Sequence, residues 1–529
     1  MKIWLATLFV AGCTQSGSLT LDLTLPTAVD LRPTGMTSIS VVASSPDIGT
    51  LSSTSILAGQ SFSANELPIA NGVQIDVLFH DDSNRLVGVG EAPNLVDIVG
   101  TKATTLSIPV RRPFIYASSG TKLYTYDPTL DPRSDKFQTV LGGVTAPQLA
   151  ISVGGDRLVV ASTNQLQIVD TATNTVMGAA ITIPGMIKDA VQVPNSHRVA
   201  VAHSTGISIV DLDAMTVTTG GGVSVDKVTV GPTLDGHLAA YGLIGRVAPP
   251  AGPDDMCTGT SSLISVDVDN PAPTATPMSL GVAVADIAAA PDTSALYGAL
   301  PCAGNVSRID AAGMLTIVST LTRAAVLAVA GEHVWAAGTK ASTPVCANSS
   351  GPTPCTPAAV ADCNATSGTV FLYVTTGSNL IVQSIPLDGG AATEVDVPEP
   401  RETMISLQDD AHQHAQVLRS LAMTPLDLVT LPGGQYVSLV TTNTYYIAAL
   451  AQGATVILPC LKTTTADWML MDMASASVAA RVRTECNLMI GTPAGTMFPD
   501  WACEDAPQGE TPTKGDYTPI SVGALFGAR

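Results

Sequence analysis

The chain has 529 residues, more than one hydrophobic core normally supports, so we expect more than one domain. Its 24 lysines and arginines stand against 44 aspartates and glutamates, and the net charge of −20 argues against nucleic acid or an anionic lipid surface as a ligand. Charged residues are only 13% of the chain, so uncharged polar residues must form most of the surface.

The N-terminal segment has the layout of an export signal. Lys2 precedes the apolar run IWLATLFVAG, which is too short to span a bilayer, and small residues lead up to Cys13. The sequence VAGC at 10–13 resembles the lipobox of bacterial lipoproteins, whose cysteine is acylated and becomes the new N-terminus. The resemblance implies a lipoprotein signal peptide at 1–13 with Cys13 as the lipidation site, and a short tether at 14–17. The alternative is an ordinary signal peptide with a misplaced start codon.

The resemblance implies that the protein is exported and lipid-anchored to the bacterial cell envelope. Thr14 follows the cysteine where an Asp would signal retention in the inner membrane, so the resemblance favours the outer membrane. No later stretch is long and apolar enough to span a membrane, and we expect the body to be soluble. Apart from Cys13, the nine cysteines leave eight that can form disulfides in an oxidising compartment.

Residues 18–110 show the period-two alternation of half-buried strands. GSLTLDLTL and VQIDVLF alternate, HDDSNRLVGVG adds a turn and a returning strand, and TTLSIPV closes the region before Pro113. No helical pattern occurs in it. The region is therefore interpreted as an antiparallel β-sandwich, and it resembles the immunoglobulin-like or transthyretin-like modules that often lie next to lipoprotein anchors. Its simplest role is a spacer that lifts the rest of the chain off the membrane.

From residue 113 onward the chain repeats. An apolar hairpin (strands A and B) precedes an alternating strand C that ends in Asp, a turn and a strand D, as in QLQIVDTATNTV and GISIVDLDAMTV. QIVDTATNTV resembles the YVTN-type repeat of lactonase-like and quinoprotein-like propellers. With LIVQSIPLDGG as a degenerate strand C, the copies predict an all-β fold in which a seven-bladed β-propeller at 113–529 follows the sandwich. The repeat aspartates are expected to accept backbone hydrogen bonds in the turns; they are Asp127, Asp170, Asp211, Asp267, Asp310 and Asp472.

The first repeat begins at strand B, RPFIYASSG, with no strand A before it, while an unassigned apolar strand lies at residues 518–527. Because an open sheet edge invites aggregation, we predict that this C-terminal strand completes the first blade.

Loop lengths predict the binding face. The B to C loops and the D to A connections emerge on one side of such a ring, and both become long in the later repeats, as in the D to A connection predicted at 401–420. Six cysteines lie in the B to C loops: Cys257, Cys302, Cys346, Cys355, Cys363 and Cys460. Cys486 and Cys503 flank the last D to A connection. We predict the pairs Cys257–Cys302 and Cys486–Cys503 and leave the other four unassigned; zinc is disfavoured because no C-x-x-C occurs.

Catalytic motifs are missing: there is no G-x-S-x-G elbow, P-loop, dinucleotide fingerprint or C-x-x-C-H. No catalytic residue is predicted, and whether the chain is an enzyme stays open. We favour a non-enzymatic binding or scaffold protein that takes a protein or glycan on the long-loop face. A lactonase-like or metal-dependent hydrolase in the funnel and a structural envelope component are the alternatives.

One segment clusters ionisable ligands, DDAHQHAQ at 409–416. His412 and His414 are two residues apart, so in an extended segment they point the same way, and Asp409 or Asp410 could complete a three-ligand set for a divalent metal. The alternative is an ordinary solvated loop, and no cofactor is predicted.

Overall fold

The structure is a computed structural model, and it describes residues 2–4, 16–26, 29–45, 49–56, 67–92, 96–99, 103–119, 122–127, 129–130, 138–145, 147–153, 155–171, 173–194, 196–233, 235, 237–248, 257–272, 274–290, 295–330, 333–339, 345–348, 351–354, 372–374, 380–397, 407–408, 413–430, 436–451, 461–473, 477–483 and 521–524. Apart from the 3-10 turn η1 (Val29–Leu31), every helix or strand within these ranges is a β-strand. None of the described residues forms a helix that could cross a membrane.

The N-terminal strands form a nine-stranded sheet with the strand order β1-β2-β9-β7-β6-β3-β4. In addition, β5 pairs with β2 and β8 pairs with β6. The strands are β1 (Lys2–Trp4), β2 (Ser16–Thr24), β3 (Ser38–Ser45), β4 (Gly49–Ile56), β5 (Leu67–Pro68), β6 (Ala70–His80), β7 (Leu86–Glu91), β8 (Val96–Ile98) and β9 (Ala103–Arg111). β2 and β9 are parallel, and β9 then pairs antiparallel with β7 at its last two residues. The alternating residues Ile75, Val77 and Phe79 of β6 are buried in one core with Leu21 and Ile39.

From Ile115 onward the strands form small antiparallel sheets in chain order. The first contains β10 (Ile115–Ser119), β11 (Lys122–Tyr126), β12 (Gln138–Leu141) and β41 (Ser521–Ala524). The second sheet contains β13 (Leu149–Val153), β14 (Arg157–Ala161), β15 (Gln165–Asp170) and β16 (Thr175–Thr182). The third contains β17 (Ile187–Gln192), β18 (Arg198–His203), β19 (Gly206–Asp211) and β20 (Thr216–Gly220). The fourth contains β21 (Lys227–Pro232), β22 (Leu238–Ile244), β23 (Ser262–Asp267) and β24 (Met278–Ser279). The fifth contains β25 (Asp286–Ala289), β26 (Leu296–Leu300), β27 (Asn305–Ile309) and β28 (Leu315–Thr320).

The later sheets are less regular. One contains β29 (Val326–Ala330), β30 (His333–Thr339), β34 (Leu380–Pro386) and β35 (Thr393–Asp396). A three-stranded sheet within its B to C loop contains β31 (Val345–Asn348), β32 (Gly351–Pro354) and β33 (Leu372–Val374). The last is five-stranded, with β36 (Leu407–Gln408), β37 (Gln413–Thr430), β38 (Tyr436–Ala451), β39 (Leu461–Asp472) and β40 (Ser477–Arg483).

These sheets are arranged as a β-propeller. The inner strands β13, β17, β21, β25, β29, β37 and β41 contact one another in that order, and β41 contacts β13 again, so the circuit is closed. Within the sheets, strands A to D follow one another as meanders, which is the arrangement that the repeat predicted.

The C-terminal strand lies where the sequence predicted it. β41 pairs antiparallel with β10, from Ile115 opposite Ala524 to Ser118 opposite Ser521. It therefore supplies the inner strand of the first small sheet, and both ends of the strand region meet there.

One end of the propeller carries an extension. β37 and β38 pair from Gln413 opposite Ala451 to Thr430 opposite Val437, with register shifts between Arg419 and Met423 and between Pro425 and Asp427. β39 joins them from Leu461. We call residues 413–424, 442–451 and 461–466 the arm. Residues 413–420 were expected to be part of a D to A loop, and this expectation was wrong because cross-strand pairing with β38 makes them a strand.

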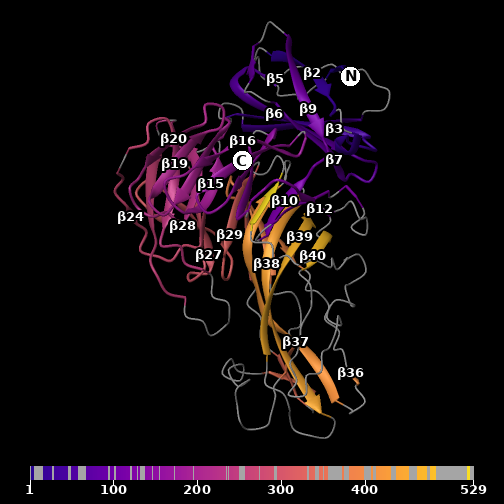
Figure 1. Cartoon of the computed structure of the whole chain (residues 1–529), viewed down its shortest axis with the longest axis vertical. Helices are drawn as coiled ribbons and strands as arrows, with labels where there is room; N and C mark the ends of the chain where they lie inside the picture. Colours follow the sequence, from indigo (N-terminus) through magenta and orange to yellow (C-terminus); the bar gives the residue numbers. More distant parts are fainter. Residues whose placement is uncertain are drawn as a thin grey trace.

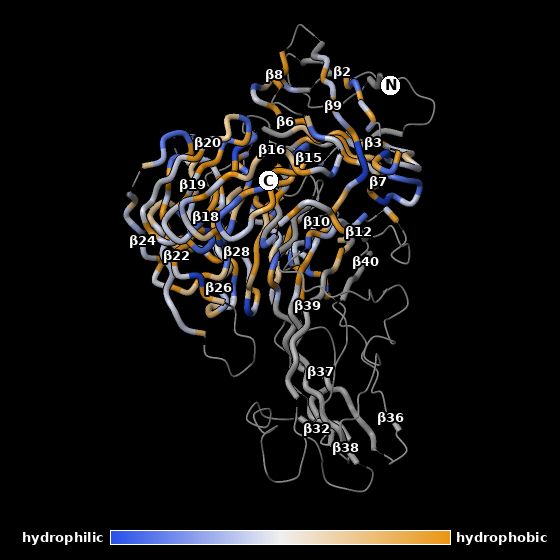
Figure 2. Tube along the Cα trace, viewed as in Figure 1, coloured by the Kyte–Doolittle hydropathy of each residue, from blue (hydrophilic) through white to orange (hydrophobic). Residues whose placement is uncertain are grey.

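The arm projects from the end that carries the long loops, and the N-terminal unit lies at the opposite end of the longest axis (Figure 1). Orange, apolar segments run through the strands of the N-terminal unit and of the propeller sheets, as Figure 2 shows. Seven hydrophobic clusters of buried residues account for this core, and each is shared between neighbouring strands.

Candidate functional site at the mouth of the propeller axis

Four inner strands carry an ionisable residue at an equivalent position of the repeat. These residues are Asp189 in KDAVQ, Lys227 in DKVTV, Asp286 in ADIAA and Asp427 in LDLVT. Inner strands run from the long-loop end of the ring, and Asp189, Lys227 and Asp286 lie within the first three residues of their strands, so they lie around the axis at that end. Asp427 occupies the aligned position of the longer strand β37. We call this set the axial cluster.

Lys227 stands between the carboxylates of the axial cluster. Its Nζ lies 3.4 Å from Oδ1 of Asp189 and 3.7 Å from Oδ1 of Asp286. Burial alone would lower the pKa of Lys227, but the charges of Asp189, Asp286 and Asp427 together raise it. Burial raises the pKa of Asp189, and the nearby Lys227 opposes that rise. The lysine is therefore held in its charged form by its neighbours.

The same carboxylates bind the backbone of the next sheet. The N–H of Val228 in β21 donates to Oδ2 of Asp189 in β17, at 2.9 Å. In the same way, the N–H of Leu327 in β29 donates to Oδ2 of Asp286 in β25, at 2.9 Å. Because each bond crosses from one sheet to the next, the axial cluster holds neighbouring blades together.

A second, more exposed group lies beside the axial cluster. Lys188 Nζ donates to Oδ1 of Asp226 at 2.6 Å and to Oγ of Ser224 at 2.9 Å. The N–H groups of Gly245 and Arg246 donate to the other oxygen of Asp226. Although burial opposes it, these donors lower the pKa of Asp226. Within the described residues, no group of three or more potential ligands is arranged to hold a metal ion.

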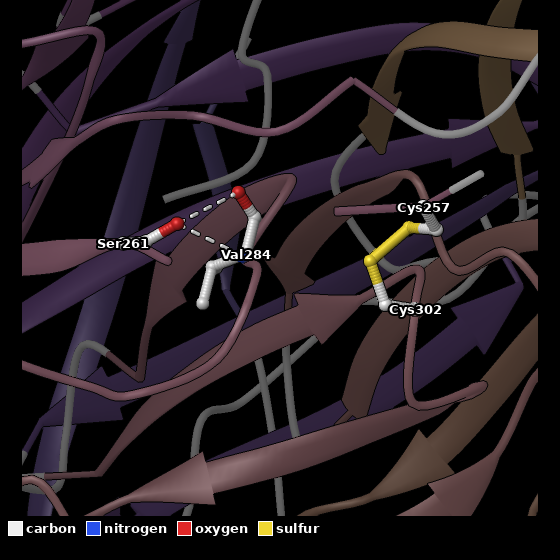
Figure 3. Close-up of a disulfide and its surroundings, with 4 residues drawn as sticks. All are labelled: Cys257, Ser261, Val284 and Cys302. Atoms are coloured by element: carbon white, nitrogen blue, oxygen red, sulfur yellow. Dashed lines mark hydrogen bonds between the residues drawn. A yellow bond between two sulfur atoms is a disulfide. The ribbon is translucent and has the colours of Figure 1, made fainter. Parts of the chain in front are cut away.

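A disulfide stiffens the loops next to this mouth. Cys257 and Cys302 are bonded, with their Cα atoms 5.2 Å apart, and they join the loop after β22 to the turn after β26 (Figure 3). This confirms the predicted pair. Ser261 strengthens the same link, because the N–H of Val284 donates to its Oγ at 3.0 Å while its hydroxyl donates to the carbonyl of Gly245 at 2.8 Å.

The remaining cysteines stay predictions. Cys346 lies in β31, for which the structure describes the backbone. Cys13, Cys355, Cys363, Cys460, Cys486 and Cys503 lie outside the described residues.

The proposed metal ligands are likewise untested. Asp409, Asp410 and His412 lie outside the described residues. His414 lies in β37, where its backbone is opposite Leu450 on one side and Gln408 on the other.

The repeat aspartates lie in the turns between strands C and D. Asp211 accepts hydrogen bonds from the N–H groups of Asp213 and Ala214, at 2.9 and 2.8 Å. Asp267 and Asp310 each accept two backbone hydrogen bonds in the same manner, and Asp127 accepts one from Thr129. Two such bonds lower the pKa of Asp267. Asp170 and Asp472 end β15 and β39.

Sequence reasoning missed the axial cluster. It aligned the repeats on strand C, where Asp recurs in nearly every copy, whereas the inner-strand position changes between Asp, Lys and apolar residues. The usable signal was a charged residue among apolar ones at the same place in four aligned inner strands.

No family model and no curated protein matches the chain. Among solved structures, hydrazine synthase of Kuenenia stuttgartiensis is 14% identical, with an alignment covering 64% of this chain and 95% of that chain and a TM-score of 0.34. The Cps50 (Swd1) β-propeller domain of Myceliophteria thermophila is 10% identical, with 63% and 95% covered and a TM-score of 0.35. At these values neither likeness carries an inference about function.

Proposed function

We propose that this chain is an exported lipoprotein whose seven-bladed β-propeller is a non-enzymatic binding or scaffold protein, with the long-loop end as its binding surface. The observation that carries the proposal is the concentration of irregular structure at that end. The arm, the β31–β33 sheet and the disulfide-linked loop after β22 all extend the regular blade pattern there. Long loops on a rigid ring are where binding usually resides.

The closed circuit of inner strands supports the proposal of seven blades, in which β41 and β37 are each the inner strand of one blade. The sheet formed by β2 to β9, in which β9 pairs with both β2 and β7, supports a sandwich-like module at 18–110. β1 (Lys2–Trp4) lies within the proposed signal peptide and is not counted in this module. The proposed propeller start at 113 falls between β9, which ends at Arg111, and β10, which begins at Ile115, whereas the proposed end of the sandwich at 110 is one residue before the end of β9.

Anchoring rests on the sequence. Cys13 in the lipobox-like VAGC would carry the acyl chains, and Thr14 favours the outer membrane. Two or more chains hold a protein stably where one does not, since each buried CH₂ contributes about 0.8 kcal/mol.

The axial cluster supports this proposal better than it supports a hydrolase in the funnel. Asp189 and Asp286 are engaged both with Lys227 and with backbone N–H groups of the next sheet. A general base needs a carboxylate or imidazole aimed at a substrate, whereas these carboxylates are aimed at the protein itself.

The arm offers the sharpest test of the binding surface. We would compare the full-length protein with a variant in which the ribbon is shortened at the Met423–Asn443 pair, and with the point variant Tyr445→Ala/Tyr446→Ala. Glycan arrays and cross-linking to purified envelope proteins would measure binding, and thermal melts would verify folding. The control variant is Met314→Ser/Ile317→Ser, which changes two exposed side chains at and just before the outer strand β28.

We expect the arm variants to lose ligands that the control retains. Equal binding by all variants would contradict the assignment of the surface. Turnover of lactone or ester substrates that is abolished by Asp286→Asn in a folded protein would instead favour the hydrolase.

A further inference from the structure

The N-terminal unit and the propeller share one hydrophobic core. Leu31, Leu78, Leu86 and Val89 of the unit belong to the same buried cluster as Phe114, Ile115, Tyr116, Leu123, Tyr124, Tyr126 and further propeller residues. The unit has its own core as well, so this shared cluster is an additional contact between the two parts.

Strand β6 shows how the unit faces two ways. Val77 and Phe79 lie in the unit's own core, and Leu78 between them is only 5% exposed and lies in the shared cluster. Because successive residues of a strand point to opposite faces, one face of β6 covers the unit's core and the other covers the propeller. On a freely hinged spacer, Leu78 would instead face water.

Arg112 fastens the junction at its centre. Its N–H donates to the carbonyl of Leu31 at 2.9 Å, and its guanidinium reaches the carbonyl of Asp30 at 3.4 Å. The same side chain pairs with Oδ2 of Asp127 at 3.2 Å and donates to Oγ1 of Thr129 at 3.1 Å. The repeat aspartate of the first blade is thus also bound to the residue that connects the two parts.

The connection leaves little room for a hinge. β9 ends at Arg111 and β10 begins at Ile115, and the intervening Pro113 and Phe114 are buried. Flexible domain boundaries usually lie in exposed, polar linkers that few contacts cross, and this one is short, apolar and crossed by the shared core.

We infer that the N-terminal unit is a rigid mount rather than a spacer, and that it fixes the direction in which the propeller presents its long-loop end. The unit packs at the end where the A to B and C to D turns lie, since Arg112 meets Asp127 in such a turn. The arm lies at the opposite end (Figure 1). A protein held by its N-terminus therefore directs the arm away from the anchoring surface, and this last consequence rests on the proposed lipidation.

Hydrogen exchange on the full-length protein tests the mount. Leu78→Ala is compared with Leu25→Ala, the same substitution at a side chain of the same unit that is 48% exposed. We expect Leu78→Ala to speed amide exchange in β10 and β11 of the propeller as well as in β6, and Leu25→Ala to leave β10 and β11 unchanged. Faster exchange confined to residues 16–111 would overturn the inference.

A second pair covers the case in which Leu78→Ala does not fold. Arg112→Lys keeps the positive charge but loses the planar guanidinium that makes several hydrogen bonds at once. The control is Arg85→Lys, the same substitution in the Arg85–Asp81 ion pair, where the arginine side chain is 67% exposed. We expect Arg112→Lys alone to speed exchange in β11 and in residues 29–31. If both lysine variants exchange like the wild type in β11, the junction does not couple the two parts. Neither pair depends on Cys13, so a failure of the anchor would leave this test intact.

Discussion

Lys227 is the residue on which the axial cluster depends. Replacing it with Met removes the cation that lies between the buried Asp189 and Asp286, and breaking a buried pair in this way costs about 3–5 kcal/mol of unfolding free energy. The matched control is Lys188→Met, whose ion pair with Asp226 is more exposed and should contribute about 0–1 kcal/mol. Denaturant midpoints of the two variants measure the difference. Similar losses in both would show that burial does not distinguish the two lysines.

His197 makes one contact between blades sensitive to pH. Its Nε2 lies 3.4 Å from Oδ1 of Asp156 in the previous sheet, and its Nδ1 lies 3.1 Å from Oδ2 of Asp213, which also pairs with Arg157. The carboxylate of Asp156 raises the pKa of His197 most, burial and Arg157 oppose the rise, and Asp213 adds to it.

The pKa of His197 in the folded protein lies above its unfolded value of about 6.5. Charged His197 therefore stabilises the fold fully below about pH 6.5, and this stabilisation is lost as the pH rises through the folded-state pKa. We expect His197→Ala to lower the melting temperature more at about pH 5.5 than at about pH 8.5. His203, whose pKa burial lowers, is present in both proteins and cancels in the difference. A destabilisation that is equal at both pH values would contradict a charged His197.

At the scale of elements, the Cys257–Cys302 disulfide joins two neighbouring blades. It spans 45 residues of sequence, and the chain-entropy model gives such a loop a stabilisation of about 4 kcal/mol. Cys257→Ser/Cys302→Ser should therefore melt well below the wild type. Repeating the melts with a reductant separates this bond from the other cysteines, because any further loss in the double variant must come from them. A double variant that melts at the same temperature as the wild type would show that the disulfide does not stabilise the protein.

The C-terminal strand β41 should matter more to stability than its length indicates. A chain that stops after residue 520 leaves β10 without β41 on its inner edge and breaks the contact between β41 and β13, whereas a chain that stops after residue 524 keeps both. We expect the shorter chain to lose the cooperative melting of the propeller and the longer one to retain it. Circular dichroism melts of the two truncations test this, and identical curves would show that the ring does not need the strand.

For the whole molecule, the prediction concerns attachment. Cys13→Ser should move the protein from the membrane fraction to the soluble fraction and abolish incorporation of radiolabelled palmitate, because a serine cannot be acylated through sulfur. Thr14→Ala is the control next to it. Membrane association that survives Cys13→Ser would mean that something other than this cysteine holds the protein there.

How far the fold could be predicted depended on local signals. Period-two alternation identified β2 and β6, and the repeated Asp identified the C strands and their turns, because both patterns are set by neighbours in sequence. The pairing of β41 with β10 was also predictable, since one repeat lacked a strand and one strand lacked a repeat. The arm was not predictable, because its strands read as loops until β38 is placed beside β37.

The same division holds for the candidate site. Cys257 and Cys302 could be paired from the sequence because adjacent repeats place their B to C loops side by side. By contrast, Lys227 meets Asp189 and Asp286 only because the ring brings three inner strands to one axis, although these residues are far apart in the chain.

The sequence by itself determined the all-β class, the repeat and its turns, and the lipobox-like start, because strand periodicity, turn chemistry and a short motif depend on residues close together in the chain. Only the tertiary structure decided that Leu78 belongs to a core shared with the propeller and that Arg112 binds Leu31 and Asp127 at once. Apolar residues on both faces of a strand such as β6 indicate that both faces are covered. Which element covers the second face is decided by packing between segments distant in sequence.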